Sequence, residues 1–341
     1  MLTRTGDFMS SDSPLSHRFS LRPGLGTGAS GIWADGALVH LVEGTESFDD
    51  NFGTTICVRR DSNELISLGS IDWIEEVILN YGLRLPDVRM MANGEPIDER
   101  KFTTSAQLGR QEVVGILDPV AVMKLIQDGA TLILQGCRRY GRNIDSFCRQ
   151  LDQELGQVTQ AGYFLTPAQS QGAPFHYDFY DAFICQLEGS KVWQLSDSPS
   201  TRPRKPWVHG QTPDQEAKVS YIETFPGDCL YLPRGTYHSG RSSDGPSLHV
   251  TIRIVQPYTF RTVLETALDT MFPTLDLDLP LPIEYSKQAT RVAALLESSL
   301  AIGAVDLKSI VGDSIDLITK DFELETRSAE VGPGCLRNGA T

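Results

Sequence analysis

The sequence predicts a mainly β fold in which helices flank a central antiparallel sandwich or barrel. Between about residues 160 and 256, short β-rich runs are separated by Gly, Pro and Ser at close spacing, which is typical of antiparallel sheets. These runs are AFICQLEG, KVWQL, KVSYIETF, DCLYLP and SLHVTIRIV. The segments on both sides instead show the periodicity of helices. With 341 residues, 40% of them hydrophobic, the chain is long enough to bury a sizeable core.

The first elements predicted before the β-rich region are a helix and a hairpin. Ser70 can cap a helix over SIDWIEEVIL, residues 70–79. The apolar residues that share one face of this helix are Trp73, Ile74, Val77 and Ile78. VRMMANGEPID, residues 88–98, is typical of a hairpin with Asn93 and Gly94 at its turn.

Two more helices and a strand are predicted before the β-rich region begins. Asp118-Pro119 opens a helix that continues to Ile126 and that Gly129 closes. TLILQ, residues 131–135, is a short buried strand. Asn143 can cap a further helix. The apolar residues on one face of that helix are Ile144, Phe147, Leu151 and Leu155.

The two ends of the chain differ in composition from its middle. Residues 1–36 are rich in Ser, Gly and Pro, which predicts a flexible tail. Helical periodicity over 257–325 predicts a small helical module, whose long apolar stripes suggest a homodimer interface. Residues 326–341 are expected to form a second flexible tail. The main domain is therefore expected over 37–256, with its β-core at about 130–256.

Charge and cysteine usage limit the classes of partner. Forty-four acidic and thirty basic residues leave a formal charge of −14, which argues against direct binding of nucleic acid and mildly favours basic partners. The six cysteines include no C-x-x-C pair, which favours a reduced, cytoplasmic compartment. No stretch reaches the roughly 18 apolar residues of a membrane span, so no membrane association is expected.

A histidine and an aspartate stand one residue apart in GAPFHYDFYDAF, residues 172–183. Successive side chains of a strand point to opposite faces, so His176 and Asp178 are expected to project from the same face. An isolated H-x-D pair would most simply be the polar face of a strand end. A functional interpretation therefore requires a third residue from elsewhere in the chain.

GDCLYLPRGTYH, residues 227–238, supplies that third residue. Its spacing G-x5-P-x-G-x2-H, which ends at His238, resembles the second motif of the cupin superfamily. The resemblance implies a double-stranded β-helix, the cupin jelly roll, whose closure brings His238 beside His176 and Asp178. Two histidines and one carboxylate form the facial triad of non-haem Fe(II) oxygenases. The three residues are therefore predicted to be the metal ligands and the catalytic centre.

A lysine refines the resemblance to the JmjC-type hydroxylases within the cupins. Lys191, in LEGSKVWQL, follows His176 by fifteen residues and opens the next predicted strand. In JmjC-type hydroxylases a Lys or Arg at this place binds the distal carboxylate of 2-oxoglutarate. The resemblance thus implies Fe(II) as cofactor, with 2-oxoglutarate and O2 as co-substrates. The alternative for Lys191 is an ordinary solvated lysine after a Gly-Ser turn.

The stretch YFLTPAQSQGAPFHYDFYDAFICQLEGSKVWQL is similar to the ribosomal oxygenases, JmjC proteins that hydroxylate Arg or His side chains of ribosomal proteins. The likeness extends over roughly residues 40–325. It departs from the family pattern at Gly162, where the histidine-hydroxylating members have an Asn, and at Arg253, which replaces a small polar residue. About 85 residues follow the β-core, so the resemblance leads us to expect the family's dimerisation module there and not its usual winged-helix domain.

Other polar residues of the β-rich region receive weaker assignments. Arg253 is a second candidate for the co-substrate carboxylate or for an acidic substrate, or else a surface arginine. His249 is expected to pack against the sheet and not to bind metal. Cys185 and Cys229 are expected to be buried thiols. RPRKPW, residues 202–207, is expected to be a solvated loop that can form part of a substrate rim.

Three functions remain open at the level of the sequence. The first is hydroxylation of a side chain in a polypeptide, either a ribosomal protein or the precursor of a peptide natural product. The second is the same chemistry on a free amino acid or small metabolite. The third is a catalytically silent cupin that binds a ligand. A complete triad together with Lys191 disfavours the third.

Overall fold

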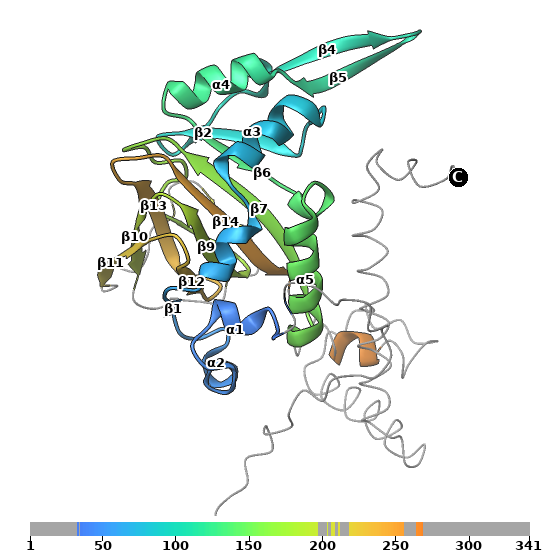
Figure 1. Cartoon of the computed structure of the whole chain (residues 1–341). Coiled ribbons are helices and arrows are strands. Elements are labelled where there is room, and N and C mark those ends of the chain that lie inside the picture. Colours follow the sequence, from blue (N-terminus) through green and yellow to red (C-terminus); the bar gives the residue numbers. More distant parts are fainter. Residues whose placement is uncertain are drawn as a thin grey trace, which may run out of the picture.

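The computed structural model describes Trp33 and residues 35–196, 203, 206–208, 211, 218–255 and 264–268 (Figure 1). The predicted tails at 1–36 and 326–341 and the helical module at 257–325 lie almost wholly outside these residues. No helix among the described residues has both the length and the hydropathy that crossing a membrane requires.

Two antiparallel sheets form the centre of the described structure, which confirms the prediction of a mainly β fold. The larger sheet has eight strands in the order β1-β12-β9-β14-β7-β6-β2-β3. Its strands are β1 (Cys57–Arg59), β12 (Cys229–Leu232), β9 (Asp181–Glu188), β14 (Ser247–Val255), β7 (Val158–Thr166), β6 (Thr131–Leu134), β2 (Val88–Ala92) and β3 (Glu95–Pro96).

The smaller sheet has four strands in the order β11-β10-β13-β8. Its strands are β11 (Val219–Thr224), β10 (Lys191–Ser196), β13 (Tyr237–Ser242) and β8 (His176–Tyr177). A separate two-stranded hairpin, β4 (Thr103–Leu108) and β5 (Gln111–Leu117), projects away from both sheets in Figure 1. The sequence analysis did not predict this hairpin.

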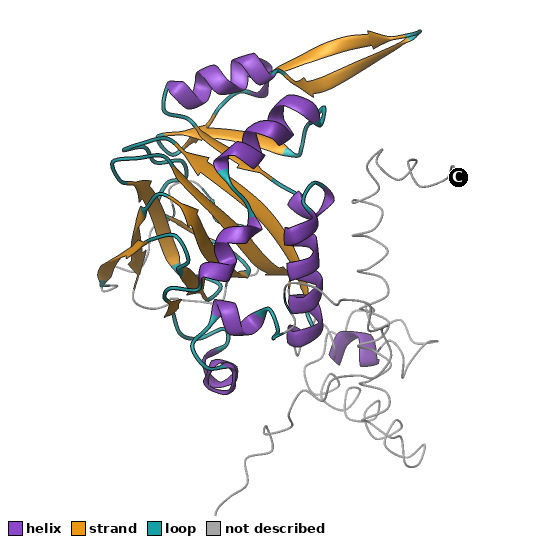
Figure 2. Ribbon diagram, viewed as in Figure 1, coloured by secondary structure: helices purple, strands orange, loops and turns teal. Residues whose placement is uncertain are grey.

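Helices cover the face of the larger sheet that points away from the smaller one (Figure 2). The described helices are α1 (Leu38–Leu41), α2 (Thr45–Asn51), α3 (Ile71–Asn80), α4 (Pro119–Gln127) and α5 (Arg142–Leu155), with short 3-10 helices η1 (Asn63–Leu68), η2 (Glu99–Lys101) and η3 (Cys137–Arg139). α5 packs against β7. Its fully buried Ile144, Phe147 and Leu151 join Tyr163 of β7 in the main hydrophobic core.

Alternation along the strands gives the larger sheet two different faces. On β14, the residues in the helix-covered core are Leu248, Val250, Ile252 and Ile254. The intervening residues His249, Thr251 and Arg253 line a cavity on the side of the smaller sheet. A single strand thus supplies both the core and the cavity wall.

The predicted caps of α3 and α4 and the predicted hairpin turn are confirmed. The Ser70 hydroxyl accepts a hydrogen bond of 3.1 Å from the Trp73 amide and caps α3. Asp118 caps α4 in the same way, through the Val120 amide at 3.0 Å. Asn93 and Gly94 have φ angles of 52° and 87° between β2 and β3, as a tight hairpin turn requires.

The predicted cap of α5 is wrong. The helix begins at Arg142, one residue before Asn143, and no side chain caps it. The Asn143 side-chain amide instead donates a hydrogen bond of 3.1 Å to the carbonyl of Ser67. Asn143 therefore forms a tertiary contact between α5 and η1 and does not cap the helix.

Candidate metal centre and co-substrate cavity

A cavity of about 600 Å³ lies between the two sheets. The larger sheet contributes one wall, and strands β8, β10 and β13 of the smaller sheet contribute the opposite wall. The sequence-predicted residues that line it are His176, Asp178, Lys191, His238, His249 and Arg253. The fold therefore brings every predicted site residue to one cavity.

His176, Asp178 and His238 meet at one edge of the smaller sheet, where β13 pairs with the edge strand β8. His176 on β8 pairs directly with His238 on β13. β8 ends at Tyr177, so Asp178 stands just beyond the strand and not within it as predicted. The three residues still converge, since one potential ligand atom from each lies within 4.8 Å of the others.

Backbone carbonyls orient both imidazoles. Nδ1 of His176 lies 2.8 Å from the carbonyl oxygen of Pro174, and Nδ1 of His238 lies 3.0 Å from that of Thr236. A carbonyl oxygen only accepts hydrogen bonds, so each Nδ1 donates its proton there and each Nε2 is left to face the other two residues. The two Nε2 atoms lie 3.9 and 3.7 Å from the Asp178 carboxylate oxygens.

The electrostatics of this group also fit a divalent metal ion. Burial, together with the neighbouring His176, lowers the pKa of His238 to about 4, although Asp178 opposes the shift. His238 is therefore neutral at physiological pH, which is the form that binds metal. Two imidazole nitrogens and one carboxylate oxygen are the ligand set of a non-haem Fe(II) site.

Lys191 lies at the closed end of the cavity. Its side chain is buried, with 3% of the residue exposed, so the solvated-lysine alternative is wrong. Nζ donates a hydrogen bond of 2.8 Å to the Thr166 hydroxyl and lies 3.3 Å from Nδ1 of His249. Among the described residues, no carboxylate lies within 4.0 Å of this ammonium group. Burial lowers the pKa of Lys191 to about 7.

His249 packs on the larger sheet as expected, and it also lines the cavity, which the sequence analysis missed. Its ring stacks on Phe164 with centroids 4.8 Å apart and meets the edge of Trp193 at 5.2 Å. Burial and the nearby Lys191 lower its pKa well below the usual value. His249 lies outside the group of three potential ligand atoms.

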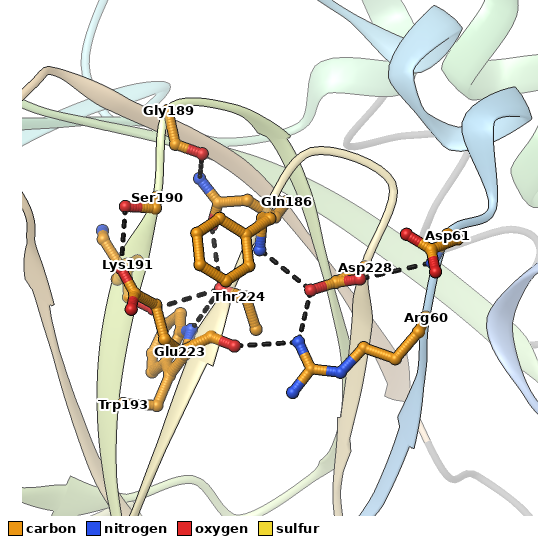
Figure 3. A network of polar contacts seen from close by, with 11 residues as sticks. Arg60, Asp61, Gln186, Gly189, Ser190, Lys191, Trp193, Glu223, Thr224 and Asp228 are labelled. Atoms are coloured by element: carbon orange, nitrogen blue, oxygen red, sulfur yellow. Dashed lines mark hydrogen bonds and ion pairs between the residues drawn. The ribbon is translucent and has the colours of Figure 1, made fainter.

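A polar network holds the start of β10, which carries Lys191 (Figure 3). The indole N–H of Trp193 donates a hydrogen bond of 3.0 Å to the Thr224 hydroxyl. That hydroxyl lies 3.3 Å from the Lys191 carbonyl oxygen and 3.2 Å from Oε1 of Gln186. The buried Asp228 extends the network in two directions. Its backbone carbonyl accepts a hydrogen bond from the Gln186 backbone amide, and its carboxylate accepts one from the guanidinium of Arg60. No sequence motif marked these supporting residues.

Arg253 lies at the open end of the cavity. Its guanidinium donates a hydrogen bond to the side-chain oxygen of Gln160 on β7 and lies 5.5 Å above the ring of Tyr180. Burial is the main reason that the pKa of the Tyr180 hydroxyl is raised, and Asp178 and Arg253 act on that pKa in opposite directions. Sequence reasoning missed Tyr180, although it follows Asp178 by two residues.

The other residues with sequence assignments lie in varied positions. Cys185 and Cys229 are buried thiols, as predicted, with their sulfurs 3.8 Å apart. Gly162 pairs with Thr251 across β7 and β14, in the cavity-facing row of the sheet. Of RPRKPW, only Pro203, Pro206 and Trp207 are described, and Pro206 and Trp207 line the cavity.

Comparisons with known proteins agree with this site. The JmjC domain family matches residues 139–262, which include His176, Asp178, Lys191 and His238. Ribosomal oxygenase 1 of Rattus norvegicus is 31% identical over 229 residues, which are 62% of this chain and 35% of that protein. The Drosophila melanogaster protein named bifunctional lysine-specific demethylase and histidyl-hydroxylase NO66 is 29% identical over 230 residues, 65% of this chain and 33% of its own length. The chain thus spans about a third of the length of these curated relatives.

Solved structures of a bacterial protein share the fold. Escherichia coli YcfD matches with a TM-score of 0.53 at 16% identity, covering 81% of this chain and 72% of that one. The structure of YcfD described as a ribosomal oxygenase in complex with cobalt and 2-oxoglutarate matches with a TM-score of 0.51, also at 16% identity, covering 81% and 71%. At this identity the likeness shows the fold alone.

Proposed function

The chain belongs to the JmjC family of iron- and 2-oxoglutarate-dependent oxygenases through residues 139–262, and from this premise we propose that it hydroxylates an amino-acid side chain within a protein or peptide. In the proposed reaction, 2-oxoglutarate loses CO2 and gains one atom of O2 to become succinate. The other oxygen atom enters a C–H bond of the substrate as a hydroxyl group. The two-sheet arrangement around the cavity supports a cupin double-stranded β-helix as the scaffold.

The convergence of His176, Asp178 and His238 carries this proposal. One potential ligand atom from each residue lies close to those of the other two. Hydrogen bonds from Nδ1 to backbone carbonyl oxygens orient both imidazoles. We assign these residues as ligands of Fe(II), with cobalt in the YcfD complex as a related precedent. When bound, Fe(II) would supply the redox chemistry that couples loss of CO2 from 2-oxoglutarate to hydroxylation.

The proposed role of Lys191 is to bind the C5 carboxylate of 2-oxoglutarate. A carboxylate buried in an apolar site needs a compensating charge, because an unpaired buried charge costs several kcal/mol. Lys191 has no carboxylate partner among the described residues, and Thr166 adds a hydroxyl beside it. This end of the cavity can thus hold the distal carboxylate while the 2-oxo end reaches the triad.

Mass spectrometry of candidate polypeptides tests the function. Ribosomal proteins and shorter peptides are incubated with the full chain, Fe(II), 2-oxoglutarate and O2. We expect one added oxygen on one side chain, and none with Asp178→Ala. Oxidation of free amino acids but of no polypeptide would favour the metabolite alternative. Absence of both oxidation and succinate would leave the non-catalytic cupin.

Assembly and location are further proposals. We propose that residues 257–325 form a helical module that joins two copies of the chain, and that the protein acts in the cytoplasm. The apolar periodicity of that segment and the absence of C-x-x-C pairs support these proposals. Light scattering at micromolar concentration should report a dimer, and truncation at Gln256 should report a monomer. A truncated chain that stays dimeric would contradict the first proposal.

A further inference from the structure

We infer that Arg253 forms a carboxylate-binding subsite at the open end of the cavity, so that the substrate carries a carboxylate near the carbon that is oxidised. The inference rests on the proposed function and adds the chemical class of the substrate. The carboxylate can belong to an Asp or Glu side chain or to the C-terminus of a peptide.

The position of Arg253 separates it from the proposed co-substrate pocket. Arg253 and His249 point to the same side of β14, four residues apart, which is about 13 Å along a strand. His249 marks the closed end, where its ring lies beside Lys191. Arg253 instead lies 5.5 Å above the ring of Tyr180, which follows Asp178 by two residues and lines the same cavity. The candidate metal centre therefore lies between two cationic ends.

The charge of Arg253 has no carboxylate partner within ion-pair distance among the described residues. Its contacts are the neutral side chains of Gln160 and Tyr180. A guanidinium group stays charged and carries five N–H donors in a planar fork, which suits a carboxylate. The half-buried Arg253 therefore has both the charge and the donors to bind one.

The cavity wall between its two ends carries small side chains. Thr251 lies between His249 and Arg253 on β14, and its partner across the strand pair is Gly162. Gly162 contributes no side chain to the row that also holds Gln160 and Phe164. At this pair of positions, therefore, little side-chain volume enters the cavity that a substrate chain would occupy.

The same charge disfavours a cationic target side chain. A substrate lysine or arginine placed at the triad would lie close to the Arg253 guanidinium and would be repelled. The overall charge of −14 favours basic partners at long range, but the open end of the cavity has the opposite local preference. The two observations agree if a basic polypeptide presents a carboxylate to the site.

Binding of matched peptides tests the inference. The full chain, loaded with Co(II) and 2-oxoglutarate so that no turnover occurs, is titrated with short acetylated peptides. One arm compares Asp and Glu with Asn, Gln and Arg in peptides with an amidated C-terminus. A second arm compares an alanine peptide with a free or an amidated C-terminus. Ligand-observed NMR gives the dissociation constants.

We expect the carboxylate form in at least one arm to bind about tenfold or more tightly than its amide. Arg253→Gln should abolish that preference, and Arg253→Lys should keep only part of it. Arg89→Gln is the matched control, because Arg89 also lines the cavity but is exposed on β2. This control should keep the preference. The melting temperature of each variant reports whether it is folded.

Equal binding of acid and amide peptides by the wild type, or no binding of either, would overturn the inference without any variant. Preferred binding of the Arg peptide would overturn it as well. A loss of 2-oxoglutarate affinity in Arg253→Gln equal to that in Lys191→Ala would assign Arg253 to the co-substrate instead. None of these results affects succinate production by the wild type, so failure here is distinguishable from failure of the proposed function.

Discussion

The two faces of the eight-stranded sheet differ in the residues that they carry, since one face packs in the hydrophobic core and the other lines the cavity. Along β14, Val250 and Ile252 are fully buried against the helices, whereas Thr251 and Arg253 face the cavity. The same strand thus alternates between residues that stabilise the fold and residues that can bind ligands. The period-two geometry of a strand makes this division possible, since neighbours point in opposite directions.

Because the two faces carry different residues, stability and activity should separate by face. Substitutions on the helix-covered face should lower the free energy of unfolding and leave the site geometry intact in the folded molecules. Substitutions on the cavity face should alter ligand binding at little cost in stability. The predictions below test this separation, beginning with the largest expected change.

Phe147→Ala on α5 should lower the free energy of unfolding by about 3–5 kcal/mol, because it leaves a void in a fully packed core. Phe164→Ala is the matched change on the cavity face, where the ring already borders open space. It should cost less than half as much. Urea denaturation measures both values, and equal costs would break the distinction between the faces.

Lys191→Ala should weaken 2-oxoglutarate binding by about one to two orders of magnitude, which corresponds to losing a charge-assisted hydrogen bond of about 1.5–3 kcal/mol. Metal binding should change little, since the triad is separate from Lys191. Lys191→Arg should be milder because the charge is kept. Isothermal titration with 2-oxoglutarate measures the change. Wild-type affinity in Lys191→Ala would place the co-substrate carboxylate elsewhere.

The pH dependence of stability should reveal the buried lysine. Lys191 has a pKa of about 7 in the folded chain and an ordinary value of 10.5. Between these values the unfolded chain holds a proton that the folded chain has lost, so stability should rise with pH from about 7 to 10.5. Lys191→Met should flatten this rise. A slope that is unchanged in Lys191→Met would show that other groups cause it.

Ile252→Val and Thr251→Ser provide the smallest test, on adjacent residues of β14. Ile252→Val removes one methyl group from the core and should cost about 1 kcal/mol. Thr251→Ser also removes one methyl group, but from the cavity wall, and should change stability by less than about 0.5 kcal/mol. Denaturant midpoints compare the two. A larger loss for Thr251→Ser would show that the cavity face is packed as tightly as the core.

The sequence was sufficient to predict that His176, Asp178 and His238 lie close together and that Lys191 shares their cavity, because the spacing of the motifs constrains these positions. His176, Asp178 and His238 converge as expected. The contacts that support them were not predictable in this way. Thr224 reaches the Lys191 carbonyl across 33 residues, and no local pattern indicates such a pairing.

Local rules also failed where tertiary contacts compete with them. Asn143 has the side chain of a helix cap, but it bonds to Ser67, 76 residues away. Tyr180 carried no sequence signal, and the fold places its ring 5.5 Å below the Arg253 guanidinium in the cavity. The sequence thus predicts which residues face the cavity more readily than which of them contact each other.

We propose that His176, Asp178 and His238 hold one iron ion used for 2-oxoglutarate turnover. Anaerobic titration with Fe(II), followed by succinate measurement after O2 is added, tests it most directly. We predict one Fe(II) per wild-type chain, and loss of succinate production in His176→Ala and Asp178→Ala without loss of the folded state. His40→Ala, which removes a histidine outside the cavity, should behave as the wild type. Unchanged succinate production in either triad variant would contradict the assignment.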